Sequence, residues 1–160
     1  FIGVYIMNFI KNLINYSLIM VFSLFISKSL FAEDFGTKDE ALALLDRAIS
    51  LVQEDRNRAL DLMTSGEGGL HPKDLYPFCL KDNGILLGHP TNVGFNIIDF
   101  QDSTGKDVGK ELINIAKYNE VNEVDFVIAR LTTDDKNEYV KTQLVTRVAD
   151  LICVVGYYSE

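Results

Sequence analysis

The residues of this chain that could do chemistry are few and scattered. His71 and His89 are isolated from each other, and no pair of His or Cys residues has the spacing of zinc ligands. The sequence has no Gly-x-Ser-x-Gly nucleophile motif and no glycine-rich phosphate loop. Catalysis would need a nucleophile with its base, a metal site or paired acids on rigid elements. We therefore expect a protein that is not an enzyme and that uses no metal and no cofactor.

Candidates for a binding site lie in the segment 138–148. The alternation of a β-strand places Tyr139, Lys141, Gln143, Val145 and Arg147 on one face, and the other face is mostly apolar. The mixed face carries cations and hydrogen-bonding groups. Periodicity alone favours a face exposed to solvent, which is the usual place of a lysine in a strand. In a confined site, the same lysine would pair with a carboxylate ligand.

Other candidates lie outside this strand. Tyr76 and Phe78 share a face of the first predicted strand, where Phe78 is expected to pack in the core and Tyr76 could aim its hydroxyl at a ligand. His89 ends the next strand and is either a structural residue or a ligand contact. Gly94 is expected to serve the backbone conformation of the loop that follows. Arg130, near the end of the third strand, is the next cation candidate.

The segments that must position these residues have clear boundaries. A capping box of Thr37 and Glu40 opens one long amphipathic helix, which should end near Ser65, before a glycine-rich stretch. The remaining elements are predicted as strands at 75–81, 85–88, 121–131, 138–148 and 151–158, with a short helix at 108–116. Strands joined by short turns should be antiparallel, which gives an α+β fold with one curved five-stranded sheet. The long irregular loop 91–106 must cover something, because such loops in compact domains are usually functional.

The first residues have the pattern of an export signal. Lys11 precedes an apolar run at 13–26, and the first acidic residue is Glu33. Residues 1–6 precede Met7, which we expect to be the natural start. The prediction is therefore residues 1–32 as upstream residues plus a cleaved signal peptide and residues 33–160 as one domain, periplasmic or secreted. The alternative is an uncleaved anchor that holds the domain on the membrane, facing the periplasm.

The charge excludes one class of partner. The formal net charge is −8, and it becomes −10 without residues 1–32, because that segment contains two lysines and no acid. An acidic protein repels the phosphate backbone, so no nucleic-acid partner is expected.

Cys79 and Cys153 allow two interpretations. In an oxidising compartment two cysteines can form a disulfide. Both lie in apolar strand segments, so the sequence favours two free, buried thiols over a disulfide.

Several segments resemble the single Cache domain family. Asp-Leu-Tyr-Pro-Phe-Cys-Leu-Lys-Asp-Asn-Gly at 74–84 is similar to its first hairpin, and Ile-Leu-Leu-Gly-His-Pro at 85–90 to its return strand. Val-Gly-Phe-Asn-Ile-Ile-Asp-Phe-Gln-Asp at 93–102 resembles its loop, Lys141 matches the lysine of its fourth strand, and Val-Gly-Tyr-Tyr at 155–158 resembles its Gly-x-Tyr ending. The resemblance covers roughly residues 40–158, in the family's order and spacing.

The resemblance implies a PAS-like fold, with a long N-terminal helix and a covering loop and short helix, outside the cytoplasm. Family members bind small molecules, very often short carboxylates, so Lys141 is expected to face a pocket beneath the loop. We predict a stand-alone extracytoplasmic sensing domain for a short carboxylate. Its expected protein partner is a membrane receptor, or a second copy of the chain through the long helix. The alternative is a structural assembly protein of the periplasm that uses this helix and has no ligand.

Overall fold

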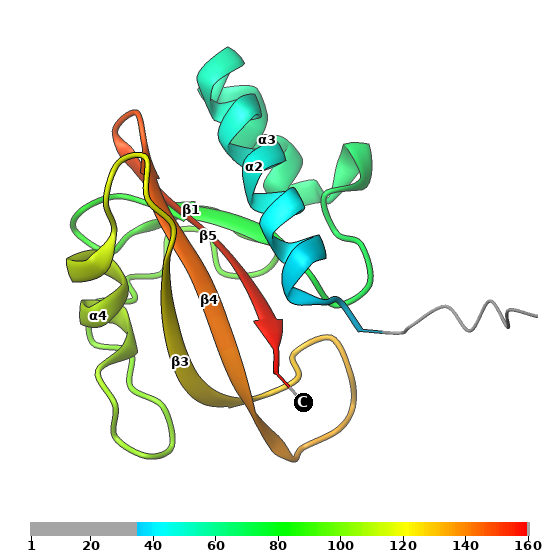
Figure 1. Cartoon of the computed structure of the whole chain (residues 1–160), viewed down its shortest axis with the longest axis vertical. Helices are drawn as coiled ribbons and strands as arrows, with labels where there is room; N and C mark the ends of the chain where they lie inside the picture. Colours follow the sequence, from blue (N-terminus) through cyan, green and yellow to red (C-terminus); the bar gives the residue numbers. More distant parts are fainter. Residues whose placement is uncertain (1–34, 160) are drawn as a thin grey trace, which may run out of the picture. The chain divides into compact units, whose positions relative to one another are not determined.

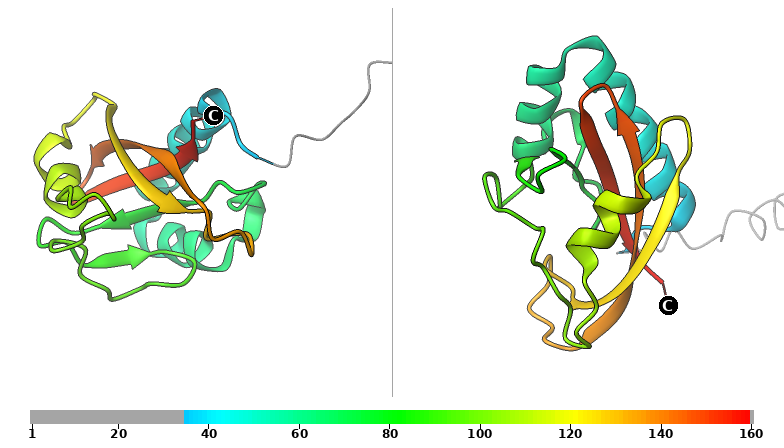
Figure 2. Two further views of the ribbon diagram at one scale, coloured as in Figure 1. Left: turned by 90° about the horizontal axis from the view of Figure 1, so that it is seen from below. Right: turned by 90° about the vertical axis from the view of Figure 1, so that its left-hand side faces the viewer.

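The computed structural model describes residues 35–159, which form a five-stranded antiparallel sheet with helices on both faces (Figure 1). The strand order is β2-β1-β5-β4-β3. The strands are β1 (Pro77–Leu80), β2 (Leu86–Gly88), β3 (Asn122–Ala129), β4 (Glu138–Val148) and β5 (Leu151–Tyr158). The helices are α2 (Lys38–Glu54), α3 (Arg56–Ser65), the short 3-10 turn η1 (Glu67–Gly69) and α4 (Val108–Ile115). Figure 2 shows α2 and α3 on one side of the sheet and α4 on the other.

The expected long helix is divided into two. α2 begins with the predicted capping box, in which Thr37 and Glu40 each bond the other's backbone N–H. The helix breaks at Asp55, whose φ of −151° is extended and whose carboxylate accepts a hydrogen bond from the Arg58 N–H. Asp55 therefore closes α2 and caps α3. The prediction of one continuous helix was wrong, because the apolar periodicity runs through a residue that is also a good N-cap.

The two long C-terminal strands have the predicted bounds, and the other three are shorter. β4 and β5 pair along their lengths, from Lys141 opposite Tyr158 to Val148 opposite Leu151. β1 begins only at Pro77, which has no N–H to give to a ladder. A register shift between Cys79 and Leu80 then limits its pairing with β2.

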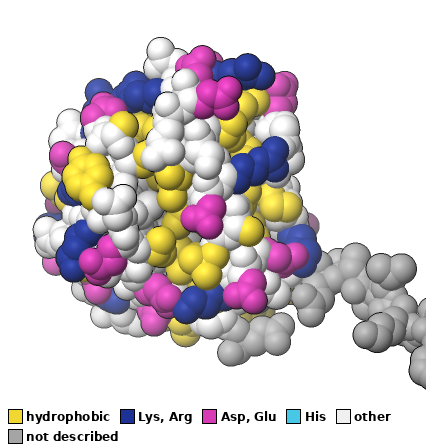
Figure 3. Space-filling model, turned by 45° about the horizontal axis from the view of Figure 1, so that its top comes forward, with side chains coloured by type: hydrophobic (Ala, Val, Ile, Leu, Met, Phe, Trp, Pro, Cys, Tyr) yellow, Lys and Arg dark blue, Asp and Glu magenta, His cyan; other side chains and the backbone are white. Residues whose placement is uncertain are grey.

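Two apolar cores lie on opposite faces of the sheet. Alternate residues of β4 and β5, such as Leu144 and Val155, pack under α2 and α3. The intervening residues, such as Val145 and Val154, pack under α4 and the loop before it. The sheet is thus covered on both faces. On the face shown in Figure 3, acidic and basic side chains are interspersed, with apolar side chains visible between them.

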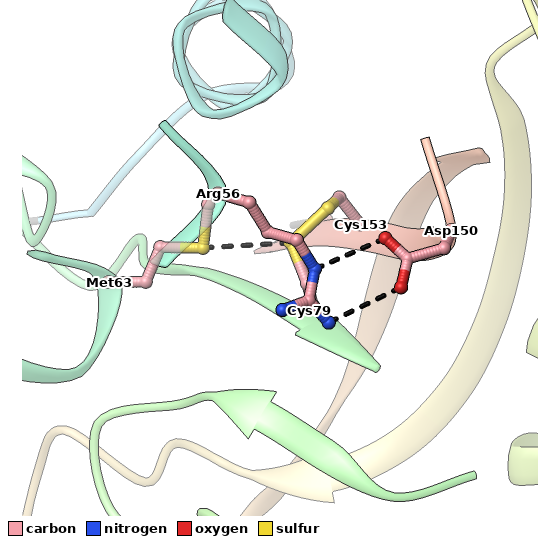
Figure 4. Close-up of a disulfide and its surroundings, with 5 residues drawn as sticks. All are labelled: Arg56, Met63, Cys79, Asp150 and Cys153. Carbon is pink, nitrogen blue, oxygen red and sulfur yellow. Dashed lines mark hydrogen bonds and ion pairs between the residues drawn. A yellow bond between two sulfur atoms is a disulfide. The ribbon is translucent and has the colours of Figure 1, made fainter. Parts of the chain in front are cut away.

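Cys79 and Cys153 form a disulfide, and the expectation of two free thiols was wrong. The two residues are directly opposite each other in the β1–β5 ladder, with Cα atoms 4.1 Å apart, and both side chains point to the face under α3 (Figure 4). Met63 of α3 lies over the disulfide, its sulfur 3.6 Å from the Cys79 sulfur. Apolar surroundings are equally compatible with a thiol and a disulfide, so only the strand register decides between them.

The residues of the expected leader and its cleavage site lie outside the described part of the chain. Between residues 35 and 159, no helix is both long and apolar enough to cross a membrane.

Candidate ligand-binding site

A cavity of about 300 Å³ lies between the sheet and the segments that cover it on the α4 side. Its walls come from β1, β2, β3, β4, α4 and the loop 91–106. The polar lining residues are Tyr76, His89, Asn92, Lys141 and Gln143. The apolar lining residues are Phe78, Leu86, Phe95, Ile97, Phe100, Val108, Leu112, Phe126, Ile128 and Leu131.

Five of the eight residues singled out in the sequence line this cavity: Tyr76, Phe78, His89, Lys141 and Gln143. The other three, Gly94, Arg130 and Tyr139, are not part of its lining. Gly94 has a φ of +84° in the covering loop, where its N–H donates to the Leu86 carbonyl. Alternation along β4 correctly placed Lys141 and Gln143 together, and Tyr139 lies on the same face beyond the end of the cavity.

Lys141 is a buried cation. Its residue is 3% exposed, and its Nζ lies 3.5 Å from the Tyr76 hydroxyl, 4.8 Å from the Tyr76 ring centroid and 4.7 Å from that of Tyr158. Among residues 35–159, no carboxylate lies within 4.0 Å of this nitrogen. Burial lowers the pKa of Lys141 to about 8, and the more distant Asp74 carboxylate partly opposes that effect.

Gly156 makes room for the lysine. Gly156 is opposite Gln143 in the β4–β5 ladder, and Lys141 is opposite Tyr158. Both pairs therefore lie on the same face of the sheet, next to each other. A Cβ at Gly156 would collide with the Lys141 Cε. The glycine of the Gly-x-Tyr ending therefore lets the lysine stem lie across the sheet, and Tyr158 flanks its ammonium.

His89 is held as a neutral hydrogen-bond donor. Its Nδ1 accepts the backbone N–H groups of Thr91 and Asn92, at 3.1 and 3.2 Å, which assigns the ring proton to Nε2. Burial lowers the pKa of His89 to about 4, and the nearby charge of Lys141 adds to that effect. The ring packs against Tyr76 and Phe78, with centroids 5.3 and 5.4 Å apart.

Gln143 has an unsatisfied amide. In the described part of the chain, its Oε1 is the one buried side-chain oxygen or nitrogen with no hydrogen-bond partner. A buried polar group without a partner costs free energy, and such groups are rare in native proteins. Because Gln143 lines the cavity, a bound molecule is a ready source of the missing hydrogen bond.

A buried ion pair stands behind Lys141. Asp74 and Arg130, 3% and 7% exposed, pair at 3.0 Å, and Asp74 also accepts the Gly36 N–H at 2.7 Å. The Arg130 guanidinium stacks on the rings of Tyr139 and Tyr158, with centroid distances of 4.9 and 4.5 Å. Arg130 and Tyr139 thus lie outside the lining, and Arg130 shares the Tyr158 ring with Lys141.

The sequence gives no indication of the role of Asp74. Its one signal was its position directly before an apolar strand. The ion-pair partner lies 56 residues away, so local pattern could not reveal it.

The covering loop is tied to the sheet at both ends. Near its start, the Leu86 N–H donates to the Phe95 carbonyl at 2.9 Å. Near its end, one oxygen of Asp102 accepts backbone N–H groups of Thr104 and Lys106, and the other accepts that of Val127. The expectation that this loop covers something is confirmed, because it supplies Asn92, Phe95, Ile97 and Phe100 to the cavity.

Comparisons with known proteins support the fold and go no further. No protein-family model matches the chain, and no curated protein is similar to it at a significant level. Solved structures do match. A methyl-accepting chemotaxis protein from Vibrio parahaemolyticus RIMD 2210633 is 18% identical, with a TM-score of 0.60 over 76% of this chain and 87% of that one.

Two further solved structures match over similar lengths. A periplasmic sensor domain of a chemotaxis protein is 16% identical, with a TM-score of 0.56 over 76% of this chain and 90% of that one. A Cache chemosensory domain described for carboxylic acid recognition is 19% identical, with a TM-score of 0.55 over 75% and 86%. These likenesses confirm the predicted α+β fold and, at the level of fold, the resemblance to Cache domains.

Proposed function

We propose that this chain, which has the fold of the Cache sensor domains, binds a small carboxylate in the cavity above β4 and serves as an extracytoplasmic sensing domain. The function is binding and not catalysis. Lys141 supplies the charge for the ligand, and Tyr76, His89 and Gln143 supply hydrogen bonds.

The observation that carries the proposal is the unpaired charge of Lys141. A buried charge is costly unless it is paired, and natural proteins pair almost all such groups. With a pKa of about 8, the ammonium stays mostly protonated at neutral pH. A carboxylate beside it would supply the ion pair that Lys141 lacks.

If the chain were an assembly protein without a ligand, Lys141 and Tyr76 should face solvent. Lys141 is buried and the Tyr76 ring packs on His89 inside the cavity wall, so the geometry favours a binding site. The apolar side of α2 and α3, which an assembly protein would use for a partner, is buried against the sheet.

Three observations support a location outside the cytoplasm: the leader-like pattern of residues 1–32, the disulfide between Cys79 and Cys153, and the periplasmic sensor domain among the fold neighbours. Disulfides persist mainly in oxidising compartments. The proposed protein partner is a membrane receptor that reads the ligand-bound state, or a second copy of the chain.

The test is a thermal-shift screen of the purified protein against small acids, amines and neutral amides. A ligand that binds only the folded state raises the apparent melting temperature with its concentration. Monocarboxylates should raise it and amines should not. A response to amines or amides alone would refute the carboxylate proposal.

A further inference from the structure

We infer that the cavity selects a monocarboxylate with a hydrocarbon body of several carbons, and discriminates against amino acids, dicarboxylates and the smallest acids. This inference rests on the proposed function and narrows its ligand class. It follows from the charge, the chemistry and the size of the lining.

The lining offers one charge. Lys141 is its cation, and among the described residues no aspartate or glutamate lines the cavity. Asp74, the nearest buried acid named above, is already engaged by Arg130 and by the Gly36 N–H. An ammonium group on the ligand would therefore lose its water without gaining a negative partner.

A second carboxylate meets the same difficulty. His89 is neutral. Its Nδ1 already accepts two backbone N–H groups, so the ring can offer a ligand only the N–H at Nε2. Arg130 is outside the lining and bonded to Asp74. One carboxylate can pair with Lys141, and the other would be desolvated without a charge partner.

The polar groups are gathered at one end of the ligand space. The Tyr76 hydroxyl is 3.5 Å from the Lys141 Nζ, and the His89 ring packs edge-on against Tyr76 at 5.3 Å. Gln143 follows Lys141 on the same face of β4. A carboxylate placed there would be contacted by Tyr76 just before β1, by His89 just after β2 and by Lys141 and Gln143 of β4.

Apart from Asn92, the remaining lining residues are apolar. Phe126 pairs with Lys141 across the β3–β4 ladder, so the apolar surface begins beside the ammonium. It continues through Phe100, whose ring meets that of Phe126 edge-on at 5.9 Å, to Val108 and Leu112 of α4. A ligand with one charged end and one apolar body matches this division.

The size of the cavity excludes a very small acid as the best fit. A volume of about 300 Å³ is at the lower end of ordinary small-molecule pockets, and a water molecule takes only ~30 Å³ of liquid. An acid of two carbons would leave most of the hydrocarbon wall without contact. Each additional buried methylene is worth about fourfold in affinity.

The experiment is calorimetric titration of the full chain, as purified, with matched pairs of acids at about pH 7. Leucine is 4-methylpentanoate with an added ammonium, and phenylalanine bears the same relation to 3-phenylpropanoate. Glutarate is pentanoate with a second carboxylate, and acetate tests size. The two branched or aromatic acids should bind at least about tenfold more tightly than leucine, phenylalanine and acetate, and pentanoate more tightly than glutarate.

The outcomes separate this inference from the proposed function. If acetate, glutarate or leucine binds as tightly as its larger or singly charged counterpart, carboxylate binding stands and the inference is overturned. If no acid binds, the proposed function fails as well. A variant checks the reason: Asn92 is an exposed loop residue of the lining, so Asn92→Asp adds an acid without disturbing the core. This variant should reduce the difference in affinity between leucine and 4-methylpentanoate. An unchanged difference would contradict the inference that leucine is excluded because the lining has no acid.

Discussion

Three neighbours surround the Lys141 side chain. Gly156 gives its stem room, and the rings of Tyr76 and Tyr158 lie near its ammonium. The electron-rich ring faces offset part of the cost of burying the cation, but they are weaker partners than a carboxylate. Binding of an acid should therefore depend on this one charge.

We expect Lys141→Met to lower carboxylate affinity at least about tenfold, which corresponds to ~1.4 kcal/mol for one charge-assisted contact. Methionine keeps most of the apolar stem and removes the ammonium, so the fold should survive. Tyr76→Phe removes one hydroxyl and should cost less, on the order of 1 kcal/mol. Calorimetric titration with an acid found in the thermal-shift screen measures both effects.

Lys136→Met is the matched control, because Lys136 is exposed in the turn before β4 and is absent from the cavity lining. It should bind the acid as the parent does. If Lys141→Met also retains the parent's affinity, Lys141 does not contact the ligand and the proposed site is wrong.

Affinity should depend on pH in a way set by Lys141. Its pKa of about 8 in the free protein means that the ammonium form predominates below that pH and is lost above it. A carboxylic acid is ionised from about pH 6 upward, so affinity should be level to about pH 8 and then fall, approaching tenfold per pH unit. Titrations between about pH 6 and pH 9.5 measure the profile.

The same profile tests His89. Because its pKa is lowered to about 4, the ring is neutral throughout this range, and no step should appear near the ordinary histidine value of about 6.5. In Lys141→Met the fall above pH 8 should disappear. Parent affinity that stays level to pH 9.5 would show that the lysine charge does not bind the acid.

Sequence alternation could identify Lys141 and Gln143 as neighbours, because a strand's period is fixed by its backbone. It could not identify the Asp74–Arg130 pair or the unsatisfied Gln143 oxygen. These depend on contacts between segments far apart in the chain, and no local pattern encodes them.

The elements themselves were easier to predict where they are long and end at marked turns. β4 and β5 have their predicted bounds, because both are long runs with a tight turn at Ala149 and Asp150 between them. The break between α2 and α3 was missed, because Ala59 and Met63 of α3 continue the apolar spacing of α2. Capping chemistry at Asp55 decided where the backbone turns.

The helix break gives a prediction. Asp55→Ala removes the acceptor for the Arg58 N–H and should lower the free energy of unfolding by about 1 kcal/mol. Denaturant unfolding measures it. Asp46→Ala is the control, since Asp46 is exposed within α2 and its side chain caps nothing in the described structure, so this variant should stay within about 0.5 kcal/mol of the parent. Equal effects of the two variants would mean that the Asp55 cap does not stabilise α3.

The two faces of the sheet serve different purposes. α2, α3 and the disulfide cover one face, and the candidate site occupies the other. Figure 4 shows the disulfide near the pair of Arg56 and Asp150, which ties α3 to the β4–β5 turn with a nitrogen–oxygen distance of 3.1 Å. The antiparallel sheet was predictable, but the β1–β5 pairing that sets Cys79 against Cys153 joins residues 74 positions apart and was not.

This arrangement predicts that stability and binding can be separated. The disulfide closes a long loop, and removal of a native disulfide from a small domain costs about 2–5 kcal/mol. We expect the free energy of unfolding of the double variant Cys79→Ala and Cys153→Ala to be lower by that amount, so that it unfolds at a lower denaturant concentration. Its affinity for the acid should change less than about threefold, because no cysteine lines the cavity and the disulfide is on the opposite face. Denaturant unfolding and calorimetry on the same preparation measure the two quantities.

A thiol count is the control for this comparison. Parent protein that is denatured without reductant should yield no free thiol from Cys79 or Cys153, and two after reduction. Two thiols before reduction would contradict the disulfide. A double variant that keeps its stability but no longer binds the acid would contradict the assignment of stability to one face of the sheet and binding to the other. The contacts around Cys79 and Cys153 would then have to shape the cavity on the opposite face.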